Sequence, residues 1–248
     1  MTDATTFNDE GFIANGLRGA DAQRRLLADL PSGLHVSRRS LPPGIVVVED
    51  YLPTPIREQL LAHAGANLGR PSTVQAEDAA AGDILTRQSA DRVTDYIDID
   101  GVAPQVHAVM RDIFTLQVGR HYGKTIAWYE RPELLRYRAG GHYSPHADSE
   151  NWDRQKKSWV RAIDRDFSIL LYLNDEFEGG SLEFENFGLR LAPTAGMLVA
   201  FPSDHRFVHS ARPTEAGERL VLVCWCAAKG SERVGQGPPE GATILDAG

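Results

Sequence analysis

The sequence predicts an α+β fold, in which helices early in the chain support one face of a jelly roll or barrel. Two observations predict this class. After Gly123 the chain is a series of short β-rich segments separated by Gly, Pro, Asn and Asp residues. Before Gly123, apolar residues recur at the three-to-four-residue spacing of amphipathic helices. Strands that follow helices in this way are typical of one enlarged β-rich domain.

Helical periodicity is present in three stretches of the first half of the chain. Residues 19–30 and 54–63 are short, whereas residues 102–122 carry the longest apolar stripe. In the second stretch, Thr54 is expected to cap the helix and Pro55 to stand in its first turn. The helices are therefore expected to precede the β-rich part and to pack against it.

The expected strands are runs of apolar, β-branched and aromatic residues bounded by turn residues. They cover residues 125–130, 132–138, 142–148, 166–174, 181–186, 196–202, 206–212 and 218–228. Residues 70–91 and 149–164 lack such a pattern and are expected to be loops, the second of them long enough to act as a substrate lid.

Composition narrows the class of partner. The chain has 248 residues, of which 42% are hydrophobic and 24% charged, as in an ordinary globular protein. Its 34 acidic residues exceed its 26 basic ones and leave a net charge of -8. A negative molecule repels phosphate backbones and anionic lipid, so neither nucleic acid nor a membrane surface is an expected partner. Oligomeric state has no signature in the sequence.

The expected organisation is an N-terminal extension over residues 1–40, one domain over 41–228, and a loose C-terminal tail over 229–248. Cys224 and Cys226 are two residues apart in an apolar run, too close along a strand for an unstrained disulfide. They are expected to be buried thiols. Because no stretch of about 18 apolar residues occurs and no basic, then apolar, leader precedes the chain, a cytoplasmic location is expected.

Candidate metal ligands occur in the segment His146-Ala147-Asp148. Residues two apart on a strand share a face, so His146 and Asp148 are able to reach one cation. A later strand carries His209, which a jelly roll would bring alongside. Two imidazoles and one carboxylate form the facial triad of non-haem Fe(II), which leaves coordination positions open. His142 and His205 are the alternatives if the strand register is shifted.

An arginine and a tyrosine predict an anion pocket near this metal. Arg219 opens an apolar strand and points to the same side as Val223 and Trp225. A cation among inward apolar residues is costly unless it meets an anion. Tyr172 has the matching parity on residues 166–174 and would place its hydroxyl near Arg219. This pair suits one carboxylate of a dicarboxylic acid.

The sequence resembles the prolyl 4-hydroxylase-like branch of the Fe(II)/2-oxoglutarate-dependent oxygenases. The resemblance runs from about residue 46 to residue 227, and four short motifs in the right order carry it. These motifs are Tyr137-Arg-Ala-Gly-Gly-His-Tyr143-Ser-Pro-His146-Ala-Asp148, Arg165-Asp-Phe-Ser168-Ile-Leu-Leu-Tyr172-Leu-Asn174, Gly179-Gly-Ser-Leu-Glu-Phe184, and the set His209, Pro213, Arg219 and Trp225.

The resemblance implies a double-stranded β-helix with iron held by His146, Asp148 and His209. It also implies that 2-oxoglutarate, a co-substrate with O2, binds at Arg219 and Tyr172. Tyr137 and Trp225 would line that cofactor pocket, and Tyr143 would face the substrate.

The implied enzyme is a dioxygenase that hydroxylates an aliphatic C–H bond of an amino acid, a peptidyl residue or a small natural product. In this reaction 2-oxoglutarate becomes succinate and CO2. Desaturation, epimerisation or ring formation at the same site stay open as alternatives. So do another metal in the same ligands and a non-catalytic sensor that binds a metal or 2-oxoglutarate.

Overall fold

The computed structural model describes residues 5–35, 40–72, 74–77, 84–87 and 90–245, and its architecture is two facing β-sheets with helices on one side. The larger sheet follows the order β1 (Leu34–His35), β2 (Val46–Val48), β17 (Leu198–Pro202), β13 (Phe167–Tyr172), β20 (Arg219–Ala228), β9 (Glu133–Tyr137), β7 (Asp95–Ile97) and β3 (Arg70–Pro71). The far end of β20 pairs with β8 (Ile126–Tyr129), and β8 with β21 (Thr243–Ile244).

The smaller sheet contains the strands that carry His146 and His209. Its order is β16 (Leu189–Leu191), β15 (Leu182–Phe184), β18 (His209–Ala211), β10 (His142–His146) and β6 (Arg92–Val93). Three separate hairpins complete the strands: β4 (Val74–Glu77) with β5 (Ile84–Arg87), β11 (Glu150–Asp153) with β12 (Ser158–Arg161), and β14 (Phe177–Gly179) with β19 (Thr214–Gly217). Each of the eight expected strands is present, and the α+β jelly-roll prediction is confirmed.

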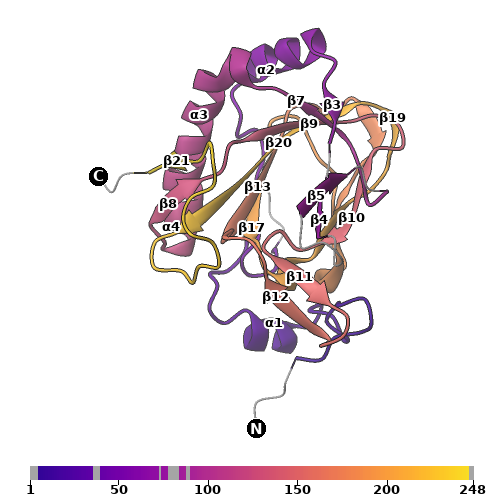
Figure 1. Ribbon diagram of the computed structural model, residues 1–248, viewed down its shortest axis with the longest axis vertical. Helices are drawn as coiled ribbons and strands as arrows, with labels where there is room; N and C mark the ends of the chain where they lie inside the picture. Colours follow the sequence, from indigo (N-terminus) through magenta and orange to yellow (C-terminus); the bar gives the residue numbers. More distant parts are fainter. Residues whose placement is uncertain (1–4, 36–39, 73, 78–83, 88–89, 246–248) are drawn as a thin grey trace.

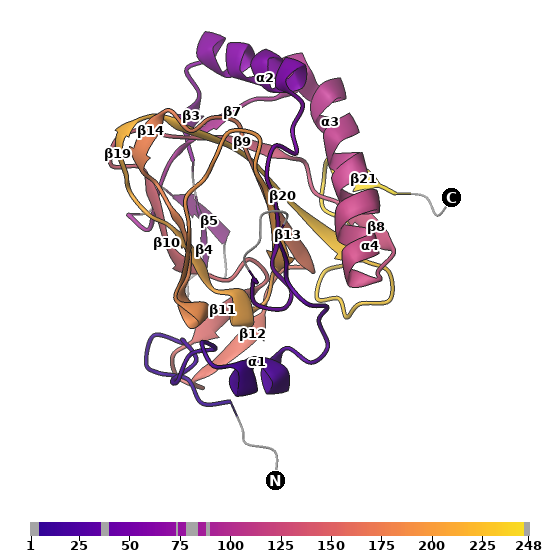
Figure 2. The ribbon, with the colours of Figure 1, turned by 180° about the vertical axis from the view of Figure 1, so that it is seen from behind.

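Helices cover one face of the larger sheet. They are α2 (Thr54–Ala66), α3 (Ala103–Asp112), a π-helical turn over Ile113–Val118 and α4 (Gly119–Tyr122), while α1 (Ala20–Leu26) lies at the N-terminal end. Figures 1 and 2 show α2, α3 and α4 together on one side of β13 and β20, with β10 on the other. Short 3-10 turns cover Asp100–Val102, Glu185–Phe187 and His205–Phe207.

The alternation of β13 and β20 decides which side chains meet the helices and which face the smaller sheet. The two strands pair in antiparallel register, with Ser168 opposite Trp225 and Tyr172 opposite Val221. One face packs into the cluster that contains the helices, and its members include Ile169, Leu171, Leu222, Cys224, Leu60, Val106 and Phe114. The other face belongs to a second cluster between the sheets, with Tyr172, Val221, Val223, Trp225, Phe184 and Phe201. The expected alternation is confirmed.

Three local expectations are wrong. Residues 70–91 are not a loop throughout, because they contain β3 and the hairpin β4–β5. Thr54 is not the cap of its helix, because Pro53 occupies that position and no side chain caps the helix. Residues 149–164 are not a structureless loop, since they contain the hairpin β11–β12, in which Trp152 pairs with Trp159 across the strands. Two tryptophans opposite each other suit a pleated surface, and this cross-strand pair is the signal that the loop prediction overlooked.

The N-terminal segment fixes this hairpin in place. The indole Nε1 of Trp152 donates to the carbonyl of Asp9 at 3.2 Å, and that of Trp159 donates to the carbonyl of Gly11 at 2.8 Å. Phe7 packs edge-on against the Trp152 ring with centroids 5.4 Å apart. The segment and the hairpin lie next to each other at the same end of the molecule in both ribbon views (Figures 1 and 2).

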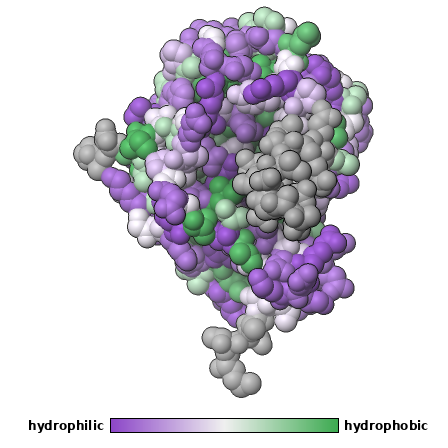
Figure 3. Space-filling view, viewed as in Figure 1, coloured by the Kyte–Doolittle hydropathy of each residue, from purple (hydrophilic) through white to green (hydrophobic). Residues whose placement is uncertain are grey.

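Part of the expected C-terminal tail is ordered, because Thr243 and Ile244 extend the sheet beside β8 and Leu245 is buried. The domain boundaries themselves stay a prediction. Within the described residues, no helix has the length and apolar character needed to cross a membrane. The face drawn in Figure 3 is mostly hydrophilic, with hydrophobic residues in small groups.

Gly11 offers a test of the contact between the N-terminal segment and the hairpin. Its φ is +86°, and a Cβ placed there would lie 2.7 Å from the Trp152 ring. Gly11→Ala is therefore expected to lower the free energy of unfolding by about 1–3 kcal/mol. Urea titration followed by tryptophan fluorescence measures it. The matched control is Gly19→Ala, because Gly19 has a φ of -89° and an added Cβ there has no neighbour within 4 Å. Equal free energies of unfolding for the two variants would contradict a close contact between Gly11 and the Trp152 ring.

Candidate active site

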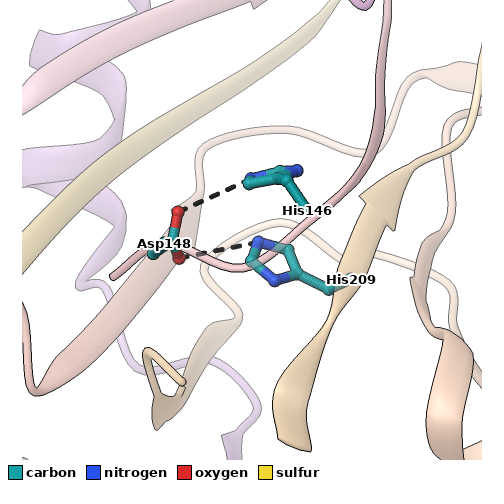
Figure 4. Close-up of side chains that lie close together, drawn as sticks. All are labelled: His146, Asp148 and His209. Atoms are coloured by element: carbon teal, nitrogen blue, oxygen red, sulfur yellow. Dashed lines mark ion pairs between the residues drawn. The ribbon is translucent and has the colours of Figure 1, made fainter. Parts of the chain in front are cut away.

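The register of two antiparallel strands brings the two histidines together. His146 ends β10 and His209 begins β18, and the two residues are direct partners in the ladder. The register of β10 shifts between Tyr143 and His146, where Pro145 lacks the N–H that a ladder needs. Asp148 follows His146 by two residues and turns toward both rings. Figure 4 shows all three side chains pointing toward one another.

The distances among these side chains suit a single cation. His146 Nε2 lies 3.5 Å from Asp148 Oδ1, and His209 Nε2 lies 3.7 Å from Asp148 Oδ2. Ligand atoms of the three residues all lie within 4.8 Å of one another. Within the described part of the chain, no other group of three or more His, Cys, Asp or Glu residues could hold a metal ion.

Hydrogen bonds from the backbone aim both imidazoles. Nδ1 of His146 lies 2.8 Å from the carbonyl oxygen of Ser144, and Nδ1 of His209 lies 3.1 Å from that of Phe207. A carbonyl only accepts, so each Nδ1 carries the proton, and the lone pair of each Nε2 is free for a metal. Burial and the nearby His146 lower the pKa of His209 to about 4, which keeps this ring neutral near pH 7.

Asp148 is buried and remains ionised. Burial alone would raise its pKa, but the neighbouring His209 and His146 outweigh that effect and hold the pKa well below its usual range. The hydroxyl of Ser168 on β13 donates to Asp148 Oδ2 at 2.6 Å and lies 2.7 Å from the hydroxyl of Ser203. The backbone N–H of Asp148 donates to the carbonyl of Ser203 at 3.1 Å. The carboxylate is thus oriented by groups from the larger sheet.

The two alternative histidines make other contacts. Both ring nitrogens of His142 face backbone carbonyls, those of Gly140 at 2.9 Å and Ala90 at 3.0 Å. His205 pairs with Glu150 at 2.7 Å and stacks on Trp159. Neither residue belongs to the three-residue group, which consists of His146, Asp148 and His209.

Arg219 is 1% exposed and shares the face of β20 that carries Val221, Val223 and Trp225 into the cluster between the sheets. Its Nη1 donates to the carbonyl of Gly180, and its Cζ lies 4.0 Å from the centre of the Tyr137 ring. Among the described residues, neither its Nε nor its Nη2 finds a hydrogen-bond partner. Burial raises the pKa of Tyr172, and the charge of Arg219 partly offsets that rise. Unpartnered donors on a buried cation suit the carboxylate of an absent ligand.

The three candidate metal ligands open into a cavity of about 100 Å³. Tyr137, Trp225 and Tyr143 line it, whereas Arg219 and Tyr172 lie outside its lining. Tyr143 stacks on His146, with ring centroids 3.7 Å apart. Other lining residues are Arg92, Glu133, Leu135, Arg165, Leu170, Leu182, Ala211 and Val223. Apolar walls around a few charged groups are typical of a small-molecule site.

Sequence reasoning missed the charged residues of this cavity. The guanidinium of Arg165 makes two hydrogen bonds to Glu130, at 2.6 and 2.7 Å, and lies 3.7 Å from the centre of the Trp225 ring. Arg92 occurs in a stretch without periodicity, so nothing in the sequence marked it. Only the antiparallel pairing of β6 with β10 brings Arg92 opposite Tyr143 and into the site.

Residues 132–227 match the model of the 2OG-Fe(II) oxygenase superfamily. A PKHD-type hydroxylase of Teredinibacter turnerae is 35% identical over 98 residues, which cover 38% of this chain and 41% of that protein. Human prolyl 3-hydroxylase 3 is 41% identical over 66 residues, 25% of this chain and 9% of that protein. The chain therefore spans well under half the length of these curated relatives.

Solved structures share the fold. One is a prolyl hydroxylase in complex with a hypoxia-inducible-factor peptide fragment, from Trichoplax adhaerens. It superposes with a TM-score of 0.56 at 21% identity, and the match covers 74% of this chain and 83% of that protein's chain. A prolyl 4-hydroxylase from Pseudomonas putida has a TM-score of 0.53 at 23% identity and covers 75% of this chain and 94% of its own. These two structures share the fold of this chain at low sequence identity. The similarity to the 2OG-Fe(II) oxygenase superfamily is a match of residues 132–227.

Ser168 offers a test of the carboxylate orientation. Ser168→Ala removes the hydrogen bond to Asp148, so affinity for Fe(II) is expected to fall by about 10–100-fold with the fold retained. Competition against a chelator of known affinity measures it. Ser210→Ala is the matched control, because its equally buried hydroxyl donates to Glu185 at 2.7 Å instead. Equal metal affinity in both variants would show that Ser168 does not position Asp148.

Proposed function

We propose that this protein is an Fe(II)- and 2-oxoglutarate-dependent dioxygenase that hydroxylates an aliphatic C–H bond of an amino acid, a peptidyl residue or a small natural product. The convergence of His146, Asp148 and His209 on one point of an apolar cavity carries the proposal. The superfamily match over residues 132–227 supports it.

The donor set fits Fe(II). Two imidazole nitrogens and one carboxylate form a facial triad that leaves positions open. In the proposed site, His146, Asp148 and His209 would hold the metal. The hydroxyl of Ser168 would keep the Asp148 carboxylate turned toward it.

The unpartnered donors of Arg219 fit the distal carboxylate of 2-oxoglutarate. Arg219 and Tyr172 would hold this carboxylate, and Tyr137 and Trp225 would cover the chain of the co-substrate. With both bound, iron and 2-oxoglutarate supply the activation of O2, and 2-oxoglutarate is converted to succinate and CO2. The protein contributes orientation and exclusion of water, for which Leu135, Leu170 and Val223 provide apolar walls.

Tyr143 is proposed to position the substrate. Its ring stacks on His146 and lines the cavity, so a target carbon above this ring would lie beside the metal. The prolyl hydroxylases among the relatives support an aliphatic carbon as the target. A cytoplasmic location is also proposed, and the free thiols of Cys224 and Cys226 support it because reducing compartments preserve them.

Arg219 tests the co-substrate site. Anaerobic titration of the Fe(II)-loaded protein with 2-oxoglutarate should produce a visible charge-transfer band. Arg219→Met should weaken 2-oxoglutarate binding at least about thirtyfold, because it removes the buried charge partner. Arg190→Met, at an arginine whose side chain is 67% exposed, is the control and should bind normally.

Loss of the Arg219 cation could also affect folding, so Tyr172→Phe provides a milder variant with weaker 2-oxoglutarate binding. Circular dichroism monitors the fold of each protein. Unchanged 2-oxoglutarate affinity in folded Arg219→Met and in Tyr172→Phe would overturn the assignment. A protein that binds 2-oxoglutarate but consumes no O2 with any substrate would instead be a sensor.

A further inference from the structure

The cavity beside the metal site contains a pair of opposite charges with no part in holding iron or 2-oxoglutarate. Nη2 of Arg92 lies 3.1 Å from Oε2 of Glu133, and both residues line the cavity. Their side chains are 12% and 32% exposed, so the pair lies largely inside the protein. Two ions in an otherwise apolar wall carry a desolvation cost that hydrophobic residues would avoid.

A second arginine of the same cavity, Arg165, makes a two-bond ion pair and serves as a comparison for Arg92. Arg165 binds both oxygens of Glu130 and covers the Trp225 ring. Arg92 instead makes one bond to its carboxylate, and its buried Nε finds no partner within the described part of the chain. Arg92 therefore retains one N–H donor that no described residue accepts.

Arg92 is also close to the reacting centre. Its Cζ lies 5.2 Å from the centre of the Tyr143 ring, and Tyr143 stacks directly on His146. One aromatic ring thus separates the Arg92 guanidinium from a proposed metal ligand. A small molecule held by Arg92 and Glu133 would extend its aliphatic part along Tyr143 toward the metal.

We propose that the substrate is a free α-amino acid, whose carboxylate binds Arg92 and whose ammonium group binds Glu133. This inference rests on the proposed oxygenase function and deepens it. A carboxylate and an ammonium group on one carbon match an adjacent cation and anion in the wall. A residue inside a peptide chain carries neither charge.

A second cavity offers a rival use of Arg92. This cavity has a volume of about 330 Å³ and is lined by Arg92, Arg136 and Arg138 as well as by Asp95. Arg138 is 48% exposed and pairs with both Asp95 and Glu218. An anionic group bound there would depend on Arg138, whereas an amino acid beside the metal would not. Arg138→Gln is therefore the matched control for Arg92→Gln.

The test begins with binding in the absence of turnover. The Fe(II)- and 2-oxoglutarate-loaded protein, kept anaerobic, is titrated by calorimetry with each of the twenty standard L-amino acids. Every amino acid that binds is then compared with its N-acetyl derivative and its primary amide, which each lack one charge. Blocking either charge is expected to weaken binding at least tenfold, because it leaves a buried partner unpaired.

The variants assign each charge to its partner. Arg92→Gln should weaken binding of the free amino acid tenfold or more, so that the free amino acid binds no more tightly than its primary amide. Glu133→Gln should likewise make the free amino acid bind no more tightly than its N-acetyl derivative. Arg138→Gln should leave the affinity of the free amino acid, relative to each derivative, unchanged. Aerobic succinate release with the same compounds should follow the same order.

Three outcomes would overturn the inference: no binding by any free amino acid, equal binding of the blocked derivatives, or dependence on Arg138 rather than Arg92. Failure of the oxygenase function itself is separate. It would appear as absence of the charge-transfer band before any amino acid is added. A normal band with turnover of only a blocked prolyl peptide would retain the oxygenase and reject the free amino acid.

Discussion

The pairing of β10 with β18 is the constraint on which the site depends. A ladder that places His146 opposite His209 sets the two rings side by side, with centroids 4.4 Å apart. A slip of one residue would turn one ring to the opposite face of the sheet. The irregularity at Pro145 belongs to this constraint, because it lets Asp148 leave the ladder and turn back toward the rings. The geometry of the candidate metal site therefore depends on the register of β10 and β18 as well as on the identity of its three residues.

The larger sheet supplies several of the groups that surround this centre. Its inner face carries the Ser168 hydroxyl that orients Asp148, the Trp225 ring that Arg165 covers, and the buried Arg219. Its outer face packs mainly apolar side chains against the helices, while Arg136 donates to the carbonyl of Ala64 in α2 and the Tyr129 hydroxyl lies 3.0 Å from Nδ1 of His107 in α3. Because side chains alternate along each strand, one face of the larger sheet packs against the helices, while the other face places polar groups such as Ser168 and Arg219 toward the candidate metal site.

Short-range patterns predicted the parts of the site that lie on regular strands. His146, Asp148, His209 and Arg219 were identified from their spacing and their parity, and the structure places the first three within reach of one ion. Arg92 and Glu133 could not be found in this way, because they come together across 41 residues and from different sheets. The 149–164 hairpin is not apparent from its polar, charged sequence, in which only the opposed Trp152 and Trp159 indicate paired strands.

The contacts between the N-terminal segment and the β11–β12 hairpin bear on the order in which the chain folds. Trp152 and Asp9 are separated by 143 residues, and Trp159 and Gly11 by 148. Contacts over such separations carry a high loop-closure entropy and form once most of the intervening chain is in place. We therefore expect the segment that contains Asp9 and Gly11 to be among the last to dock. It would then dock on the β11–β12 hairpin only after the sheets that bear the candidate metal ligands have formed.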